Sequence, residues 1–395
     1  MDARWQAARK ILAVRLDNLG DVLLATPAIH ALHRALPEAR ITLLTSPVGA
    51  QVAGLNPDLH DVVVYRAPWM DPDRVLPQDP SREASMVALL RRRGFDAAVI
   101  FTSYHESSLP AAYLCYLAGV PLRHAASIDG PGSLLTSRHR HPDRPMHEVE
   151  RGLDLVGGLG IPPAGDELVF RPLDADRAVM CDLVRSLRRG DRPVVAVHPG
   201  CSCPARTYPP ELFARVADAI QADLGADVIW TGASSEQDLI RRIQSFMTRP
   251  GHSVVGRTNL SQLGALLAEC DAAVTSNTGP MHVAAAVKTP VVALFALTNP
   301  PNEWHPWGVP YRLLNRSVPC AICYKRICPY HQECLREVPI GEVINAVAEM
   351  IAERERSGSA GRQDTAGEGI TKSKGLVALR AANLVGGSGR EGQCQ

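Results

Sequence analysis

The segment at residues 274–286, Val-Thr-Ser-Asn-Thr-Gly-Pro-Met-His-Val-Ala-Ala-Ala, constrains the fold more than any other stretch of the chain. Its first residues form a small apolar run, which predicts a buried strand. Residues 276–279 are turn and helix-capping types, and Pro280 suits the first position of a helix because the N–H that it lacks would be unpaired there. A second apolar run follows at residues 291–295. Strand, turn, helix and strand together predict a parallel βαβ unit.

The turn of this unit suits a phosphate ligand. A helix that begins near Gly279 has unpaired backbone N–H groups and the positive end of its dipole at that point. His282 lies one helical turn after Thr278, so both side chains could face the same ligand. An ordinary turn of an α/β sheet, with His282 as a satisfied surface residue, accounts for the same residues, so the turn alone leaves both interpretations open.

Strand and helix patterns alternate along the rest of the chain and predict parallel sheets with helices on both faces. Two such arrays of similar size predict an α/β fold of two facing Rossmann-like domains, with a cleft between the carboxyl ends of their strands. The predicted strands lie at residues 10–16, 41–45, 62–65, 97–101, 193–198, 226–231, 254–255, 272–275 and 291–295.

The expected domain boundary lies in a connection with three prolines, at residues 161–174. Residues 1–172 then form the N-terminal domain and residues 173–356 the C-terminal domain, whose last predicted helix spans residues 340–355. The remainder, residues 357–395, is rich in Gly and Ser, and this composition predicts a mostly disordered tail.

Composition and charge exclude some classes of protein. The 395 residues are 46% hydrophobic and 21% charged, as in ordinary globular proteins. A net charge of +1 gives no electrostatic basis for nucleic-acid binding. No apolar run approaches the ~20 residues of a membrane helix, and no signal-peptide pattern precedes the first strand. These features predict a cytoplasmic location.

Two carboxylates follow the first predicted strand, in the segment Arg-Leu-Asp-Asn-Leu-Gly-Asp at residues 15–21. The segment lacks the G-x-G-x-x-G pattern of dinucleotide-binding turns. Asp21 is expected at a helix start, where it could act as a general base toward an acceptor hydroxyl, although helix capping is the commoner role of such a residue. Asp17 is the rival carboxylate.

A loop punctuated by Gly and Pro follows the first strand of the second half, at residues 199–210. Ser202 and backbone N–H groups there could contact phosphate oxygens, and Arg206 could neutralise a diphosphate leaving group. Glu236 follows the turn at Gly232, where a carboxylate can accept hydrogen bonds from ribose hydroxyls. A solvated loop arginine and a plain N-terminal helix charge are the structural alternatives for Arg206 and Glu236.

Three of these motifs, taken together, resemble glycosyltransferase family 9, which holds the bacterial heptosyltransferases of lipopolysaccharide core assembly. They are Leu-Gly-Asp-Val-Leu-Leu-Ala-Thr-Pro-Ala-Ile at residues 19–29, the His-Pro-Gly…Arg-x-Tyr-Pro loop at 198–209, and Thr-Gly-Pro-Met-His at 278–282. The resemblance covers about residues 10–355 in the same order. It implies a GT-B fold with the acceptor domain first, and an inverting transfer from a nucleotide sugar, commonly ADP-heptose, without a required metal.

The resemblance also implies roles for single residues. Asp21 matches the catalytic base, and Arg206 matches a basic residue, often lysine, that binds the donor phosphates. Glu236 matches the acidic residue near the nucleoside. The matching residues of the phosphate-binding turn are Thr278, Gly279 and His282. One position departs from the family, which usually has an acidic residue where this chain has Asn277; an amide can hydrogen-bond a sugar hydroxyl but carries no charge.

We therefore expect an inverting glycosyltransferase that moves a sugar, with heptose favoured, to a hydroxyl of a glycan, a lipopolysaccharide-type molecule or another lipid-linked acceptor. A non-catalytic nucleotide-sugar-binding protein, which Asn277 favours, and a sugar-nucleotide epimerase of similar fold are the alternatives. Several arginines could meet an anionic acceptor or the inner face of the cytoplasmic membrane, or could form a plain solvated surface. They are Arg91, Arg92, Arg93, Arg138 and Arg140.

Four cysteines at residues 320–334 form a separate pattern. Thiols at this spacing could hold a structural zinc ion or an iron–sulfur cluster, and local disulfides or free buried thiols are the alternatives. A metal is easier to justify than a disulfide in the cytoplasm. No acidic cluster with metal-ligand spacing accompanies the other motifs, so the transfer itself is expected to need no cofactor. The four cysteines are Cys320, Cys323, Cys328 and Cys334.

Overall fold

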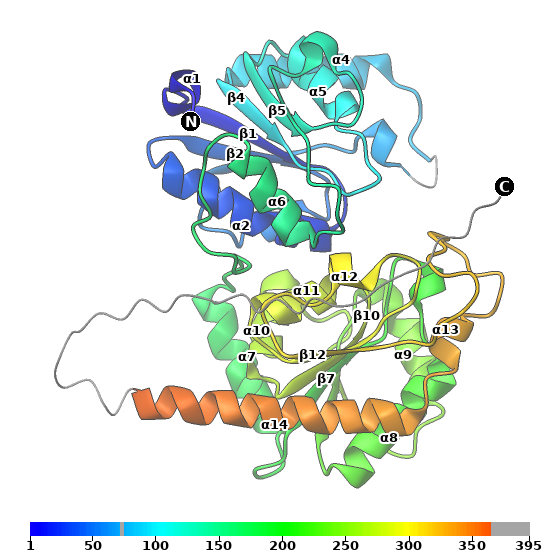
Figure 1. Cartoon of the computed structure of the whole chain (residues 1–395). Coiled ribbons are helices and arrows are strands. Elements are labelled where there is room, and N and C mark those ends of the chain that lie inside the picture. The colour runs from blue at the N-terminus through cyan, green and yellow to red at the C-terminus, as the bar shows by residue number, and fades with distance from the viewer. Residues whose placement is uncertain (72–74, 365–395) are drawn as a thin grey trace, which may run out of the picture. The chain divides into compact units, whose positions relative to one another are not determined.

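Two parallel six-stranded sheets with helices on both faces form the framework of the protein (Figure 1). The computed structural model describes residues 1–71 and 75–364. The strand order is β3-β2-β1-β4-β5-β6 in the first sheet and β12-β11-β10-β7-β8-β9 in the second. The predicted α/β fold with two Rossmann-like halves is thereby confirmed. We call the two halves the first lobe and the second lobe.

The first lobe is built around β1, which pairs in parallel with β2 on one side and β4 on the other. The chain alternates between sheet and helices, as parallel pairing requires. Its strands are β1 Lys10–Arg15, β2 Arg40–Thr45, β3 Asp61–Val64, β4 Ala97–Ile100, β5 Leu122–Ala126 and β6 Ser137–His139. Its helices are α1 Ala3–Gln6, α2 Leu19–Ala35, α3 Ala50–Ala53, η1 Pro68–Met70, α4 Pro80–Arg93, α5 Leu109–Leu117, η2 Gly132–Leu134 and α6 Glu148–Gly157.

The second lobe repeats this plan around β10 and β7, which pair with each other at the centre of its sheet. Its strands are β7 Val194–His198, β8 Asp227–Trp230, β9 His252–Ser253, β10 Ala272–Ser276, β11 Val291–Leu294 and β12 Tyr311–Leu314. Its helices are α7 Asp174–Leu187, η3 Pro204–Arg206, α8 Pro210–Asp223, η4 Ser234–Glu236, α9 Gln237–Gln244, α10 Leu260–Glu269, α11 Gly279–Ala286, α12 Pro301–Trp304, α13 Glu333–Arg336 and α14 Ile340–Asp364.

The central strands carry unbroken apolar runs because both of their faces are covered. Residues 11–14 of β1 and 272–275 of β10 are all buried. The side chains of one face pack under α2 and α6 in the first lobe, and under α7, α10 and α11 in the second. Continuous burial of this kind is the reason that the central strands are readable from the sequence.

The connection between the lobes is hydrogen-bonded to both of them. Val169 N donates to Thr26 Oγ1 of α2 (2.9 Å), and Leu173 N donates to Ser261 Oγ of α10 (2.9 Å). Arg171 N donates to the carbonyl oxygen of Leu55 in the first lobe (2.8 Å). A boundary at residue 172, between these anchors, remains a prediction.

The last described helix, α14, continues to Asp364 and so extends past its expected end at residue 355. The predicted tail therefore begins inside this helix, and residues 365–395 lie outside the described part of the chain. Among the described residues, no helix combines the length and the apolar character needed to cross a membrane.

Candidate active site

The candidate active site lies where the first turns of α2 and α11 meet, one from each lobe. A side-chain carbon on Gly20 would lie 2.7 Å from the His282 ring, and one on Gly279 would lie 3.0 Å from Leu19. Both helices therefore begin with a glycine whose missing side chain permits close approach. Each helix follows a central strand of its sheet, so the contact brings together the carboxyl ends of the two sheets, where α/β proteins bind ligands.

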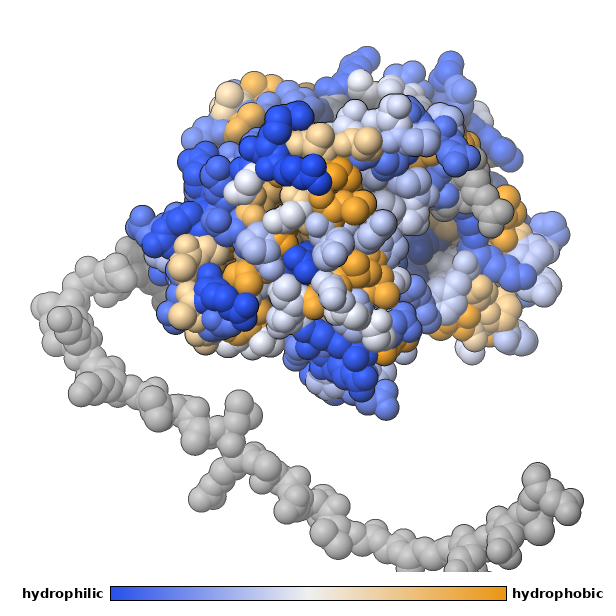
Figure 2. All heavy atoms as spheres, turned by 90° about the horizontal axis from the view of Figure 1, so that it is seen from above, coloured by the Kyte–Doolittle hydropathy of each residue, from blue (hydrophilic) through white to orange (hydrophobic). Residues whose placement is uncertain are grey.

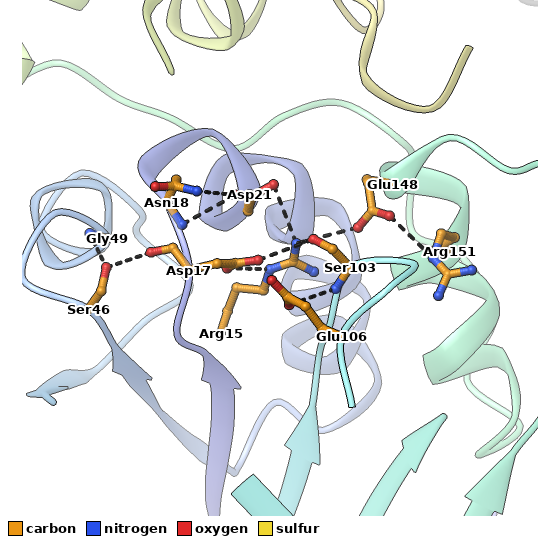
Figure 3. A network of polar contacts seen from close by, with 10 residues as sticks. All are labelled: Arg15, Asp17, Asn18, Asp21, Ser46, Gly49, Ser103, Glu106, Glu148 and Arg151. Carbon is orange, nitrogen blue, oxygen red and sulfur yellow. Dashed lines mark hydrogen bonds and ion pairs between the residues drawn. The ribbon is translucent and has the colours of Figure 1, made fainter. Parts of the chain in front are cut away.

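The first lobe contributes a buried polar network centred on Arg15, the last residue of β1 (Figure 3). Arg15 Nε donates to Asp17 Oδ1 (2.8 Å), and Arg15 Nη2 donates to Ser103 Oγ (2.7 Å). The same Nη2 lies 3.5 Å from Asp21 Oδ1 and 3.4 Å from Glu148 Oε2. One guanidinium thus orients three carboxylates from two separate segments of the chain.

Two further residues complete this network (Figure 3). Glu106 Oε2 accepts a hydrogen bond from Ser103 N (3.0 Å), and Arg151 Nε lies 3.3 Å from Glu148 Oε1. Four carboxylates consequently share two guanidinium groups. The excess of negative charge suits a base that must accept a proton.

Burial changes the ionisation of the inner carboxylates. It raises the pKa of Asp17 and that of Glu106, and the charge of Arg15 opposes both shifts. It also raises the pKa of Glu148 to about 7, against the attraction of Arg15 and Arg151. Burial would lower the pKa of the Arg15 guanidinium, but the charges of Asp17 and Asp21 raise it overall. Arg15 accordingly stays charged and holds the network together.

Asp21 is the most accessible of the Arg15-linked carboxylates. Its side chain is 15% exposed, against 3% for Asp17 and 1% for Glu148. Asp21 also caps its own helix, because its Oδ2 accepts a hydrogen bond from Asn18 N (3.2 Å). The capping role and a catalytic role are compatible, since Asp21 lies in the first turn of α2 beside α11 of the second lobe.

The second lobe contributes the turn between β10 and α11. Thr278 is the N-cap residue of α11, with extended backbone, and Gly279 and Pro280 begin the helix. His282 is buried rather than on the surface, and its Nδ1 has no hydrogen-bond partner within the described residues. Burial lowers the pKa of His282 to about 4, although the charge of Asp21 opposes the shift. The imidazole is therefore neutral at pH 7.

Arg206 is held at the same edge of the second sheet. Its Nε donates to Thr298 Oγ1 (2.9 Å), and its Nη1 lies 3.5 Å from the carbonyl oxygen of Asn277. Arg206 is therefore bonded to the protein and is not a solvated loop arginine, which was the structural alternative for this residue. These contacts place a fixed positive charge beside the turn that begins α11.

Asn277 has a structural role that the sequence did not reveal. Its Oδ1 accepts from Ala296 N (3.1 Å), and its Nδ2 donates to Asn299 Oδ1 (3.0 Å). The side chain is buried, and these bonds tie the end of β10 to the segment after β11. Both polar atoms of the amide are bonded within the protein, and a contact of Asn277 with the donor sugar remains a prediction.

Glu236 lies between the ends of β7 and β8. Its Oε2 accepts from Ala233 N (2.7 Å) and lies 3.8 Å from His198 Nε2. A side chain at Gly200 would collide with the carboxylate, so the glycine permits this position. Burial lowers the pKa of His198, and the charge of Glu236 opposes that shift. Ser202 is exposed in the same loop, at the end of β7.

Three of the four cysteines lie in the segment between β12 and α13, the fourth, Cys334, lies in α13, and none of them forms a disulfide. The structure therefore differs from the alternative of local disulfides among them. Cys328 Sγ accepts from Tyr330 N (3.4 Å) and Gln332 N (3.3 Å). The sulfurs do not form a group of three within 4.8 Å; among the described residues, only His139, His141 and Asp154 form such a group of potential metal ligands.

Sequence reasoning missed the centre of the first-lobe network. Arg15 ends an apolar strand, and a charge at that position is a usable signal that was not assigned a role. Glu106 and Glu148 carry no local signal, because they reach Arg15 only through the tertiary fold. Thr298 and Asn299, which bond to Arg206 and Asn277, were missed for the same reason.

The fold and the paired helix starts define a two-lobed α/β protein of the kind that binds ligands between Rossmann-like halves. A crystallised glycosyltransferase family 9 protein from Veillonella parvula has a similar structure, with a TM-score of 0.74 at 20% identity, over 89% of this chain and 99% of that one. The Escherichia coli ADP-heptose lipopolysaccharide heptosyltransferase II gives a TM-score of 0.68 at 19% identity, over 88% of this chain and 99% of that one.

Comparison of sequences identifies the family, whereas the structural similarity shows the fold. The model of the family described as "Glycosyltransferase family 9 (heptosyltransferase)" matches residues 84–333. Lipopolysaccharide heptosyltransferase 3 of Escherichia coli K12 is 26% identical over 295 residues, which cover 73% of this chain and 82% of that protein. The chain therefore belongs to glycosyltransferase family 9.

Proposed function

We propose that the protein transfers a heptose from a nucleotide-activated donor, with ADP-heptose favoured, to a hydroxyl of a lipopolysaccharide-type glycan or other lipid-linked acceptor. Family membership supports sugar transfer, and the names of the related heptosyltransferases support the choice of sugar and acceptor. The contact of Gly20 with His282 carries the proposal, because it puts the acceptor-side carboxylate of α2 beside the phosphate-type turn of α11.

In the proposed reaction, Asp21 accepts the proton of the acceptor hydroxyl as that oxygen attacks the anomeric carbon. The attack comes from the face opposite the diphosphate, so the anomeric configuration inverts. Arg206 and the N-terminus of α11 stabilise the negative charge that develops on the departing phosphate. Thr278, Gly279 and His282 contact the donor phosphates, Ser202 contacts the same group, and Glu236 accepts from the ribose. Asn277 acts by shaping the turn.

A donor screen by calorimetry tests the donor site. ADP-, GDP- and UDP-sugars are titrated into the full chain and into Arg206→Ala. We expect one nucleotide class to bind, with affinity reduced about tenfold or more (~1.4 kcal/mol) in the variant because a charged phosphate contact is lost. Arg242→Ala, an exposed arginine of α9, is the matched control and should bind as the wild type does. Absence of binding to every nucleotide sugar would contradict the donor assignment.

Product analysis separates the alternatives. An inverting transferase gives a glycan product of opposite anomeric configuration, visible by NMR, only when acceptor is present. Release of an altered sugar without acceptor would indicate an epimerase, and donor binding without turnover would indicate a non-catalytic binding protein. Asp21→Asn should bind the donor normally and lose turnover, whereas loss of both would assign Asp21 to folding or donor binding instead.

We also propose a peripheral membrane contact by the first lobe. Figure 2, which views the molecule from above, shows apolar side chains scattered among hydrophilic ones on the upper surface of the first lobe. Tyr113, Tyr116 and Leu117 of α5 are exposed, and Arg91 donates to the carbonyl oxygen of Leu117. Binding to vesicles with anionic lipid, but not to neutral vesicles, is the expected result. The predicted cytoplasmic location is part of this proposal.

We further propose that Cys320, Cys323, Cys328 and Cys334 hold a structural zinc ion or an iron–sulfur cluster. Their close spacing along residues 320–334 and the N–H···S bonds to Cys328 support this, since such bonds stabilise thiolates. Elemental and sulfide analysis of the purified protein distinguishes zinc from iron–sulfur, and absence of both would leave the cysteines as free thiols. The transfer step itself is proposed to need no metal.

A further inference from the structure

A second group of ligand-type side chains lies in the first lobe, apart from the cysteines. His139 Nε2 lies 2.6 Å from Asp154 Oδ2, and His141 Nδ1 lies 2.7 Å from the same oxygen. The three ligand atoms all lie within 4.8 Å of one another. His139 ends β6, His141 lies two residues later, and Asp154 comes from α6. Alternate residues of an extended segment face the same side, which explains why both rings reach one carboxylate.

We propose that His139, His141 and Asp154 bind a divalent transition-metal ion such as Zn²⁺. Two imidazole nitrogens and one carboxylate oxygen suit zinc, cobalt or nickel better than magnesium or calcium, which prefer oxygen ligands. The remaining coordination positions would be filled by water. The ion would join the edge strand β6 to α6.

The charge and accessibility of the group support this proposal. One carboxylate and two neutral imidazoles carry a single negative charge, which partly neutralises a divalent ion. The cation Arg151 lies near His141, but it is itself paired with Glu148. The Asp154 side chain is 29% exposed, and the two rings are 15% and 13% exposed, so an ion can enter from solvent. Gly158 leaves room for the ring of His139, because a side chain there would collide with it.

Metal binding would move the proton of each imidazole from one ring nitrogen to the other. Asp154 Oδ2 can only accept hydrogen bonds when ionised, so His139 Nε2 and His141 Nδ1 each donate a proton to it in the free protein. Binding requires each ring to carry its proton on the other nitrogen. Histidine protonation at acid pH competes with the metal, and the affinity should therefore fall as the pH is lowered.

The position of the group connects it to the candidate active site. His141, Glu148, Arg151 and Arg15 line one cavity of about 10 Å³, room for about one water molecule. The helix α6 carries Glu148 and Arg151 in its first two turns and Asp154 in the next. An ion at Asp154 would consequently fix the helix that presents Glu148 to Arg15.

Cobalt titration of the full chain tests the site, because Co²⁺ reports its ligands in its visible spectrum. Cobalt bound by thiolates gives an intense charge-transfer band, whereas nitrogen and oxygen ligands give only weaker d–d bands. The titration uses the full-length variant in which all four loop cysteines are replaced by serine, because those thiols could bind Co²⁺ themselves. We expect about one equivalent of Co²⁺ to bind to this variant without the thiolate band. Asp154→Asn and His141→Ala should weaken this binding by about 100-fold or more, since each removes a ligand. His252→Ala, in β9 of the second lobe, is the control and should leave binding unchanged.

Two outcomes would overturn the proposal: absence of the d–d spectrum in the cysteine-to-serine variant, or d–d binding that persists when Asp154→Asn or His141→Ala is added to it. Circular dichroism shows whether each variant is folded, and Asp154→Asn preserves the shape of the side chain. As a second measurement, Zn²⁺ should raise the melting temperature of a variant with all four loop cysteines replaced by serine. It should not do so when Asp154→Asn is added to that variant, and an equal rise in both would also contradict the site.

Discussion

At the scale of single residues, Glu148 shows how the fold rather than the sequence determines chemistry. Its side chain is 1% exposed and faces two guanidinium groups, yet burial still raises its pKa to about 7. The sequence identified Asp17 and Asp21 because they follow a strand directly. It offered no reason to choose Glu148, whose partner Arg15 lies 133 positions away in the chain.

Replacement of Glu148 by Gln should change how stability depends on pH. A carboxyl group whose pKa is raised on folding stabilises the native state below its ordinary pKa of 4.5 and loses this contribution as the pH rises to about 7. Glutamine does not titrate. The free energy of unfolding of Glu148→Gln relative to wild type should therefore rise between pH 4.5 and 7, by up to about 3 kcal/mol. Urea unfolding at several pH values measures it, and a constant difference would contradict the raised pKa.

For Asn277, in contrast to Glu148, the sequence indicated the place of the residue in the fold but not its hydrogen-bond partners. The sequence places it correctly in the turn before α11, but its neighbours Ala296 and Asn299 become visible only in the structure. Position along a parallel strand therefore indicated which residues gather at the site, including Asp21, Thr278 and His282. It did not indicate which polar atoms are already bonded to the protein.

At the scale of elements, the strands at the centre of each sheet and most helices could be predicted from the sequence, and three strands could not. The strands β5, β6 and β12 were not predicted from the sequence. The strand β5 contains buried Arg123 and His124, which break the apolar pattern, and β6 has only three residues. The strand β9 of the second lobe lies at residues 252–253 rather than at the predicted 254–255. The helix α2 begins at Leu19, and Asp21, which was expected at a helix start, lies in its first turn and caps it.

Gly20→Ala should disturb the meeting of α2 and α11. The new methyl group would lie 2.7 Å from the His282 ring, so the buried ring or one helix must move. We expect a loss of about 1–3 kcal/mol in the free energy of unfolding, and a lower rate of sugar transfer. Urea unfolding and a transfer assay with ADP-heptose measure the two effects.

Gly341→Ala is the matched control for that substitution. Gly341 is the second residue of α14, as Gly20 is of α2, and nothing lies within 4 Å of the added carbon. It should be neutral or stabilising by up to about 1 kcal/mol, since alanine favours helices over glycine. Equal effects of the two substitutions would show that the contact between the helices is not the cause.

At the scale of the whole molecule, a second contact joins the lobes beside the candidate site. His147 at the start of α6 donates from Nε2 to the carbonyl oxygen of His305 (3.0 Å) and stacks on Trp307 with ring centroids 4.5 Å apart. Val149 N donates to His147 Nδ1 (3.2 Å), so the neutral ring satisfies both nitrogens. Burial lowers the pKa of His147 to about 3, and the charge of His305 acts in the same direction.

Acid should weaken this contact. A histidine whose pKa is lowered on folding stabilises the native state above its ordinary pKa of 6.5 and loses that contribution as the pH falls toward about 3. Between pH 7 and pH 5 the loss amounts to about 2 kcal/mol for His147. His147→Phe keeps an aromatic ring without titrating, so its free energy of unfolding should fall less over this range. Trp307→Phe retains His147 and should keep the wild-type slope; parallel curves for wild type and His147→Phe would contradict the prediction.

The anchored connection between the lobes sets the geometry of any opening motion. Within the described residues, the chain passes from the first sheet to the second once. Hydrogen bonds hold Arg171 to the first lobe and Leu173 to the second, and the ring of Pro172 between them fixes its own φ angle. A rotation of one lobe relative to the other that keeps both hydrogen bonds can change only the few backbone torsion angles next to Pro172. The connection therefore acts as a short hinge. Substrate entry and product release would follow a rotation of one lobe about this hinge, and the two lobes would not reorient independently.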